Sequence, residues 1–264
     1  MKLSFIIINY RSREYLEKCI SSVFECVQNV GFEIIVVNND LEKLKCNEKR
    51  SDANNKFKNN LKIIEVNENI GFGRGCNVGA KEAKGEILCF LNPDTEIVSK
   101  SIDNILKEFE SNKEVGVIGS KIIEKNGKVQ DWIVGGELTL GKIIKNNIGI
   151  ISDKKIWNSK EKQDVDWVTG AVLFIRKNLF EKIDGFDKNF FMYFEDIDLC
   201  KRVRLEKYKI IYFPNFIVQH LGGGSVKSRK MQKKEYYKSQ DYYFEKWFGK
   251  KTKNILRFLR KFYF

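Results

Sequence analysis

The chain has 264 residues, of which 42% are hydrophobic, 31% charged and 13% aromatic, and it contains only two prolines. This composition excludes a disordered chain, a collagen-like repeat and a small disulfide scaffold, and it is sufficient for a substantial core. No apolar run approaches the ~20 residues that a membrane-spanning helix needs. The apolar stretch at residues 3–8 is not followed by a cleavage site, so we expect no signal peptide.

The cysteines show no functional spacing. Six occur in the chain, at positions 19, 26, 46, 76, 89 and 200. They form no C-x-x-C pair and no metal-finger pattern, which indicates buried thiols in a reducing compartment. We therefore expect a cytoplasmic globular protein.

Positive charge is concentrated at the C-terminus. The formal net charge is +13 at pH 7, and residues 227–264 hold thirteen Lys or Arg against three acidic residues, which makes a local net charge of +10. Such a segment attracts phosphate, either of nucleic acid or of an anionic lipid surface. A solvated, lysine-rich surface is the simpler alternative.

The first half of the chain alternates between strands and helices. Short apolar runs predict buried strands at residues 3–8, 32–37, 61–66, 87–91 and 115–118. Helices are predicted after Ser12 as N-cap, at residues 78–84, and in a stretch that Ser99 opens. Residues 41–60 are polar and are expected to form a surface loop or a weak helix. This alternation predicts a parallel sheet with helices on both faces and a ligand at the carboxyl ends of the strands.

The second half follows a mixed pattern. Asn126-Gly127 predicts a hairpin between residues 122–123 and 129–134. Further strands are predicted at 165–175 and 210–213, and a helix at 195–207. Residues 138–160 show no clear period and are expected to form a variable loop. We therefore expect an α/β domain with a mixed second half and a basic, helical C-terminal region.

The glycine-rich segment Gly71-Phe72-Gly73-Arg74-Gly75 does not fit a dinucleotide-binding loop. A G-x-G-x-x-G motif requires glycine where Cys76 or Val78 stands, and the first strand is followed by no glycine. A P-loop lysine motif is absent as well. A hydride-transfer enzyme or a nucleoside triphosphatase therefore has little support.

Acidic residues follow two of the apolar segments. Asp94 comes directly after the strand at 87–91, where its carboxylate would hold Mg²⁺ or Mn²⁺ or serve only as a turn residue. Glu195, Asp196 and Asp198 follow five large apolar residues at 190–194. They either cap the next helix or place a carboxylate of raised basicity beside an apolar wall, where it would take a proton from a hydroxyl.

His220 is the only histidine in the chain, and glycines follow it at residues 222–224. A neutral imidazole beside a loop that approaches phosphate closely is a reasonable metal ligand. A purely structural histidine is the alternative.

Taken together, eight short motifs occur in one order: FIIINY (5–10), EIIVVNN (33–39), NIGFGRGCN (69–77), LNPDT (91–95), TGA (169–171), GFD (185–187), FFMYFEDID (190–198) and HLGG (220–223). This succession resembles the family 2 inverting glycosyltransferases of the GT-A fold, and most closely their rhamnosyltransferase-like branch. The resemblance covers residues 2 to about 226. It implies a GT-A domain at 1–226, with a nucleotide-sugar half at about 1–120 and an acceptor half at about 121–226, followed by the basic amphipathic extension at 227–264.

The resemblance also assigns roles to residues. Asp94 matches the metal-binding carboxylate of the family's D-x-D element, whose first acid is Asn92 here, and His220 matches a histidine that completes the metal site. Asp196 matches the catalytic base, with Glu195 beside it. The remaining assignments are Tyr10 and Asn38 at the nucleobase, Asn69 and Arg74 near the nucleotide and diphosphate, and Trp167, Gly170 and Ala171 on the acceptor and sugar side.

One position departs from the family. Asn38 stands where the family usually has an aspartate that accepts the base N–H of uracil or thymine. An asparagine carbonyl can still accept this hydrogen bond, but it carries no charge and its amide can also donate.

The implied reaction is a single displacement at the anomeric carbon. Asp196 would deprotonate the acceptor hydroxyl, while Mg²⁺ or Mn²⁺ at Asp94 and His220 neutralises the departing diphosphate. The basic, aromatic C-terminal segment is suited to an anionic membrane surface, or it packs its apolar face on the domain. We therefore expect a peripheral protein on the inner face of a bacterial membrane, with a lipid-linked acceptor.

The donor is the least determined part of this interpretation. The favoured reaction moves L-rhamnose from dTDP-L-rhamnose to a lipid-linked or cell-surface saccharide, in polysaccharide or O-antigen biosynthesis. UDP-galactofuranose, UDP-hexosamine and GDP-mannose are alternative donors, because donor choice rests on a few pocket side chains. More remote alternatives are a non-catalytic nucleotide-sugar-binding protein and a nucleic-acid-binding protein, although no nucleic-acid-binding signature is present. The oligomeric state stays open.

Overall fold

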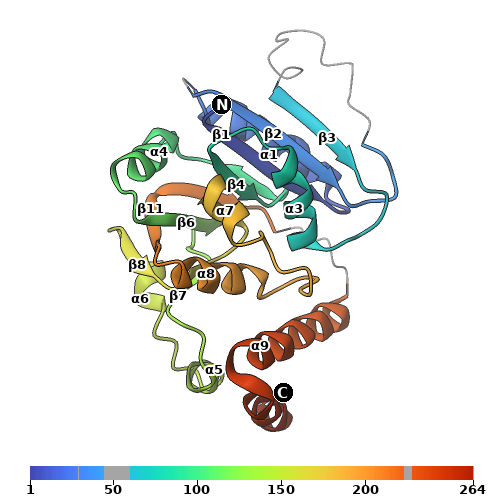
Figure 1. The fold of residues 1–264 in the computed structure, drawn as a ribbon, viewed down its shortest axis with the longest axis vertical. Helices are drawn as coiled ribbons and strands as arrows, with labels where there is room; N and C mark the ends of the chain where they lie inside the picture. Colours follow the sequence, from blue (N-terminus) through green and yellow to red (C-terminus); the bar gives the residue numbers. More distant parts are fainter. Residues whose placement is uncertain (29, 45–59, 223–227, 264) are drawn as a thin grey trace.

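A mixed β-sheet forms the centre of the molecule (Figure 1). The computed structural model describes residues 1–28, 30–44, 60–222 and 228–263. Within these residues the sheet has nine strands, in the order β3-β2-β1-β4-β10-β6-β11-β5, with β8 beside β11. Four strands of the first half are parallel: β1 (Leu3–Asn9), β2 (Phe32–Asn38), β3 (Leu61–Glu65) and β4 (Ile87–Leu91). Their carboxyl ends therefore meet at one edge, as the alternation of strands and helices predicts.

The second half adds antiparallel strands to this sheet. β10 (Val172–Arg176) lies antiparallel between β4 and β6 (Val115–Glu124). β11 (Lys209–His220) runs parallel to β6 and antiparallel to β5 (Thr95–Ile97) and β8 (Gln163–Val165). A separate pair consists of β7 (Val134–Gly135) and β9 (Trp167–Val168).

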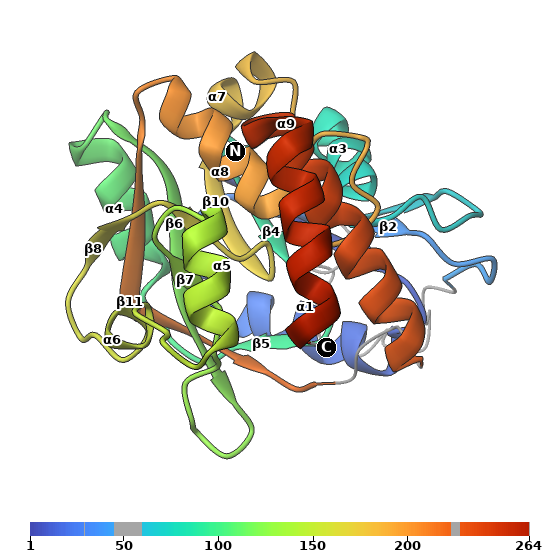
Figure 2. The ribbon, with the colours of Figure 1, turned by 90° about the horizontal axis from the view of Figure 1, so that it is seen from below.

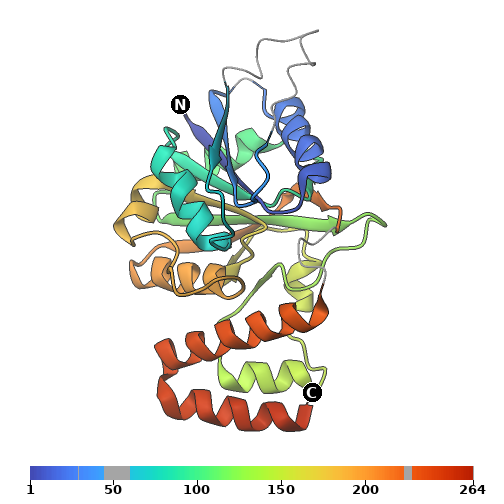
Figure 3. The same cartoon turned by 90° about the vertical axis from the view of Figure 1, so that its right-hand side faces the viewer.

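Helices cover the sheet. Figure 3 shows α1 (Arg13–Cys26) and α3 (Phe72–Glu82) on opposite sides of the parallel strands. The remaining helices before the C-terminal region are α4 (Ile102–Ser111), α5 (Leu140–Asn147), α6 (Lys154–Trp157), α7 (Lys177–Lys182) and α8 (Glu195–Leu205). The fold is thus α/β, with a mostly parallel first half and a mixed second half, as expected.

Several helix boundaries differ from the prediction. α3 begins at Phe72 instead of residue 78, because its buried face consists largely of glycine and alanine and gives no apolar period. This face lies so close to the sheet that a Cβ at Gly79 would stand 2.5 Å from Ile6. Ser12 occupies the N-cap position of α1 without capping it, since its hydroxyl donates to the carbonyl of Tyr10. α4 begins at Ile102, and the Ser99 hydroxyl instead accepts a hydrogen bond from Ile217 N.

The prediction of a loop at residues 138–160 is wrong in part, because this stretch contains α5 and α6. Thr139 caps α5 by accepting a hydrogen bond from Lys142 N, and Trp157 of α6 is 1% exposed. The expected strand at 165–175 is broken into parts of β8, β9 and β10. The hairpin turn at Asn126-Gly127 is present, but its return arm pairs only through a bridge between Ile123 and Val129.

Three sequence expectations involve residues outside the described parts of the chain. Most of the expected loop at 41–60 is one, since residues 45–59 are not described, and Cys46 is another. The third is the glycine run after His220, of which residues 223 and 224 are not described. The five described cysteines are free thiols, and Cys26 alone among them is not fully buried.

The C-terminal segment folds back onto the domain. α9 (Arg229–Tyr263) is interrupted at Gly249, whose φ of 83° and ψ of 167° are not helical, so two helices meet there at a sharp turn (Figures 2 and 3). Buried side chains of α9 pack against α5 and the segment before α8: Tyr243, Phe244 and Leu256 against Leu138, Ile143, Phe190 and Phe194. In the described parts of the chain, no helix has the length and apolar character required to cross a membrane.

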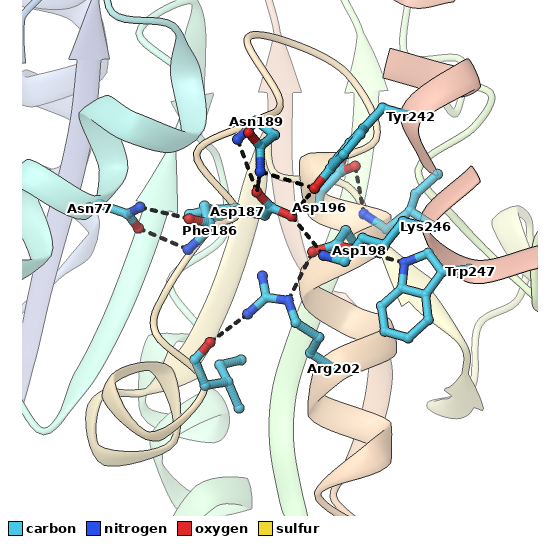
Figure 4. Close-up of polar contacts among 12 residues, drawn as sticks. Asn77, Phe186, Asp187, Asn189, Asp196, Asp198, Arg202, Tyr242, Lys246 and Trp247 are labelled. Carbon is cyan, nitrogen blue, oxygen red and sulfur yellow. Dashed lines mark hydrogen bonds and ion pairs between the residues drawn. The ribbon is translucent and has the colours of Figure 1, made fainter. Parts of the chain in front are cut away.

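An ionic network fastens α9 to the start of α8 (Figure 4). Asp198 is completely buried, and its carboxylate contacts Lys246 Nζ at 2.6 Å, Trp247 Nε1 at 2.9 Å and Arg202 Nε at 2.8 Å. Lys246 also contacts Asp187 at 2.7 Å. Burial acts to raise the pKa of Asp187, but Lys246 and other hydrogen-bond donors outweigh it and lower this pKa to about 2. The cationic partners compensate the buried charge of Asp198, and loss of one of them would leave that charge poorly compensated.

Replacement of Lys246 tests this network. Lys246→Met leaves Asp187 without its lysine and Asp198 with only Arg202 and Trp247 as partners, so we expect a loss of about 2–3 kcal/mol in unfolding free energy. Lys251→Met removes an exposed lysine from the same helix and is expected to change it by less than about 0.5 kcal/mol. Urea unfolding of the full chain measures the stability of both variants. Equal stability of Lys246→Met and Lys251→Met would contradict the structural role of Lys246.

Candidate active site

A cavity of about 740 Å³ lies at the carboxyl edge of the parallel strands. Ten of the twelve residues proposed from the sequence line it: Tyr10, Asn69, Asn92, Asp94, Trp167, Gly170, Ala171, Glu195, Asp196 and His220. The other two, Asn38 and Arg74, do not. The fold thus brings together side chains from segments that are far apart along the chain.

Asp94 and His220 meet because two short strand pairings join their segments. Asp94 lies in the turn between β4 and β5, and His220 ends β11, which pairs with β5 so that His220 stands opposite Thr95. His220 Nε2 lies 3.1 Å from Asp94 Oδ1. The other ring nitrogen, Nδ1, lies 2.9 Å from Gln130 Oε1. Gln130 Oε1 can only accept, so it pairs with a protonated Nδ1, and Nε2 is then available as a metal ligand when the ring is neutral.

This pair fits a divalent cation. Two neighbouring ligands at about 2.1 Å from one ion lie about 3 Å apart, which matches the separation of Nε2 and Oδ1. The described residues contain no group of three or more acidic, histidine or cysteine side chains that could hold a metal without further ligands. The donor set therefore suits an ion whose remaining ligands are water and substrate phosphate oxygens.

Asp196 and Glu195 begin α8 after a strained turn. Tyr193 and Phe194 have φ values of 70° and 66°, which non-glycine residues rarely adopt, and such strain often occurs at functional sites. Asp196 lines the cavity, and its two carboxylate oxygens accept hydrogen bonds of 2.8 Å from the backbone N–H groups of Gly170 and Ile197. These bonds fix the carboxylate at the cavity wall.

Burial changes the acidity of both carboxyl groups. It raises the pKa of Glu195 well above the usual range, and the neighbouring Asp196 adds to this rise. Glu195 is 6% exposed, and its Oε2 atom has no hydrogen-bond partner among the described residues. Burial also raises the pKa of Asp196, against the opposing effect of its backbone hydrogen bonds. Asp196 is consequently a stronger base than an exposed aspartate.

The structure places Asn39, rather than Asn38, at the cavity. Asn38 is fully buried, and its side chain is used by hydrogen bonds with Asn9, Glu65 and the carbonyl of Glu42. Asn39 lines the cavity and donates to the carbonyl of Gly71, while its Oδ1 atom is buried without a hydrogen-bond partner in the described chain. The free acceptor at this edge therefore belongs to the residue after the one predicted.

The remaining predicted residues take different positions. Arg74 is exposed on α3, and its Nε donates to the carbonyl of Lys188 at 2.8 Å, away from the cavity lining. Gly170 and Ala171 act through their backbone, since Gly170 N donates to Asp196 and Ala171 O accepts from Asn92 N at 2.9 Å. The Trp167 indole lines the cavity and donates to the carbonyl of Gly136.

Sequence analysis missed several further residues that line the cavity. Gln130 is one, and Trp132, with a φ of 61°, an exposed fraction of 44% and an edge-to-face contact with Trp157, is another. Others come from α9: Gln232, Tyr236, Tyr237, Gln240, Leu256, Leu259 and Arg260. The sequence carries no local signal that would place these residues at a site formed by distant strands.

Comparison with known proteins gives a family match. The model of glycosyl transferase family 2 matches residues 4–183, and a model described as the N-terminal domain of galactosyltransferase matches residues 153–235. Rhamnosyltransferase WbbL of Escherichia coli is 28% identical over 57% of this chain and 60% of its own length. N-acetylglucosaminyl-diphospho-decaprenol L-rhamnosyltransferase of Mycobacterium tuberculosis is 26% identical over 61% of this chain and 59% of its own. The chain thus spans less than two thirds of these relatives.

Solved structures share the fold at lower identity. A crystal structure of GalNAc-T7 with UDP, GalNAc and Mn²⁺ superposes with a TM-score of 0.65 at 14% identity, and covers 92% of this chain and 50% of its own. A crystal structure of S. aureus TarS 1-349 gives a TM-score of 0.57 at 19% identity, and covers 92% of this chain and 64% of its own. These structures have the same central arrangement of strands and helices as the present chain.

Proposed function

The chain belongs to glycosyl transferase family 2 and has the GT-A fold, and we propose that it moves L-rhamnose from dTDP-L-rhamnose to a lipid-linked or cell-surface saccharide with inversion at the anomeric carbon. Sugar transfer from a nucleotide-sugar donor is the general activity of the chain. One observation supports a metal-dependent displacement most: the Asp94–His220 pair and the Asp196 carboxylate line the same cavity.

These residues suit a single-displacement reaction. Asp196, held by two backbone N–H groups and raised in pKa by burial, would take the proton of the acceptor hydroxyl. A divalent cation held by Asp94 and His220 would neutralise the charge of the leaving diphosphate. Tyr10, Asn69 and the free acceptor of Asn39 would bind the nucleoside, and Asn92 would lie beside the diphosphate.

Relatives support rhamnose without determining it. Two of the similar proteins are named as rhamnosyltransferases, while another, from Pyrococcus furiosus, is named dolichol-phosphate mannosyltransferase. A TarS crystal structure with the same fold holds UDP-GlcNAc. UDP-galactofuranose, UDP-hexosamine and GDP-mannose are therefore the donors to compare with dTDP-L-rhamnose.

Nucleotide binding tests the donor and metal assignments together. We expect dTDP to raise the melting temperature of the full chain only with Mn²⁺, by an amount equivalent to about 2.7 kcal/mol at 100 times its dissociation constant. His220→Ala should abolish the Mn²⁺-dependent part of this increase in melting temperature. Gln130→Met should weaken Mn²⁺ binding about tenfold, since it frees the imidazole to change tautomer. A larger increase in melting temperature with UDP or GDP would assign the donor to that nucleotide instead of dTDP. No increase with any of the three would contradict the proposal.

Asp196 carries the test of the chemical step. We expect Asp196→Asn to lower the transfer rate by about 10²–10⁴ with nucleotide binding nearly unchanged, because the proton acceptor is lost while the Asn oxygen keeps one of the two backbone hydrogen bonds. The exposed Asp164 provides a control, and Asp164→Asn should react at the wild-type rate. The pKa of Asp196 is raised above 3.8, and the carboxylate acts as a base only when it is deprotonated. The transfer rate should therefore fall as the pH decreases through this raised pKa. Normal turnover of Asp196→Asn would exclude Asp196 as the base.

We also propose that α9 attaches the protein to the inner face of a bacterial membrane. Apolar side chains on its second half are exposed, with fractions of 51% at Ile255, 58% at Phe258 and 69% at Phe262. Lysines and arginines lie between them along the helix, as in helices that rest on anionic lipid surfaces.

Flotation with vesicles tests this attachment. The full chain should float with vesicles that contain phosphatidylglycerol and remain behind with phosphatidylcholine alone, and the double variant Phe258→Ser with Phe262→Ser should lose flotation. Leu205→Ser removes an equally exposed apolar residue, 61% exposed, from the end of α8 and should not affect it. Equal flotation of the double variant and the wild type would show that α9 is not the attachment site.

A further inference from the structure

The C-terminal helix α9 forms one wall of the catalytic cavity. Leu256, Leu259 and Arg260 from its second half line this cavity, together with Ile143 and Ile144 of α5. Figures 1 and 3 show α8, whose first turn carries Asp196, between the sheet and the layer of α5 and α9. The basic segment is thus part of the site, in addition to forming an exposed surface of the molecule.

The position of α9 places it on the side of the cavity where the acceptor would bind. Donor phosphates belong at the sheet edge beside Asp94 and His220, and the attacked hydroxyl must lie at Asp196. The rest of the acceptor molecule, beyond that hydroxyl, must therefore extend toward α5 and α9. The chemistry of this wall indicates what the acceptor contains.

Arg260 is the cationic side chain that α9 contributes to this wall. Its side chain is 14% exposed, its guanidinium lies 4.3 Å from the centre of the Tyr237 ring, and its Nη2 donates to both Gln240 and Asp241 at 2.7 Å. Its Nε–H is buried without a hydrogen-bond partner in the described chain, which is costly unless a ligand accepts it. Asp241 is also 3.6 Å from Arg257, so one carboxylate faces two guanidinium groups. This leaves a positive charge that suits an anionic ligand.

An apolar strip continues from Arg260 to the surface. Leu256 and Leu259 line the cavity, and Ile255, Phe258 and Phe262 are exposed on the same helix. Spacings of three and four residues place neighbouring members of this set side by side. A ligand with an anion at Arg260 can therefore lay an attached hydrocarbon chain along the helix toward the membrane.

We propose that Arg260 binds the phosphate of an acceptor in which a sugar is joined through phosphate to a lipid, and that the lipid lies along the second half of α9. This inference rests on the proposed glycosyl transfer and specifies the class of its acceptor. The sugar hydroxyl would then lie at Asp196, and the lipid would point out of the cavity.

Binding of a simple lipid phosphate tests this proposal without knowledge of the sugar. The full chain, with its donor site filled by Mn²⁺ and the best-binding nucleoside diphosphate, is titrated calorimetrically with farnesyl diphosphate, farnesol or inorganic pyrophosphate. We expect farnesyl diphosphate to bind best. Arg260→Gln should weaken it about tenfold or more and Arg260→Lys less, since lysine keeps the charge. Lys251→Gln, at an exposed lysine of α9 that does not line the cavity, should bind like wild type.

Further measurements separate the possible failures. Leu259→Glu places a carboxylate in the lipid path and should abolish farnesyl diphosphate binding, so the proposal stays testable if Arg260→Gln does not fold. Unchanged binding in Arg260→Gln or Leu259→Glu, or equal binding of farnesol and farnesyl diphosphate, would overturn the acceptor assignment alone. In those cases the nucleotide-dependent thermal shift would persist. Absence of that shift from the wild type would instead overturn the proposed donor reaction.

Discussion

A fully buried carboxylate, that of Asp198, connects the parts of this molecule. Burial of an aspartate without cationic partners would cost several kcal/mol, and here Arg202 and Lys246 provide the compensating charge. Arg202 lies one turn along the same helix, whereas Lys246 comes from the C-terminal helix. The ion pair therefore joins the turn that carries Asp196 to the helix that closes the cavity. The position of the turn that carries Asp196 and the attachment of the basic segment depend on the same contact.

The site also depends on the antiparallel strands added to the parallel half. β10 enters between β4 and β6, and β11 reaches across to β5, which sets His220 beside Asp94. Each of the two residues ends or follows a strand, so backbone hydrogen bonds fix their separation. The sheet thus brings together two side chains, Asp94 and His220, that neither segment could position alone.

The C-terminal segment has both a buried apolar face and exposed apolar side chains. Its buried face packs against α5 and the start of α8, while Ile255, Phe258 and Phe262 face outward. Packing on the domain and binding to a lipid surface are compatible, because different faces of α9 serve them. One helix thus lines the cavity that holds Asp196 and also presents exposed apolar side chains.

The sequence by itself determined the buried strands, since continuous apolar runs such as residues 3–8 need no distant partner to be recognised. Its ordered motifs also selected Asp94, Asp196 and His220. Tertiary structure decided the rest. α5 and α6 were missed because they have only eight and four residues and are held by packing against α9 and by the hydrogen bond from Trp157 to the carbonyl of Val134. Asn39 lines the cavity and Asn38 does not, which the sequence could not show. The roles of Gln130, Lys246 and Arg260 depend on contacts between segments far apart along the chain, and local patterns of hydrophobicity and charge contain no information about such contacts.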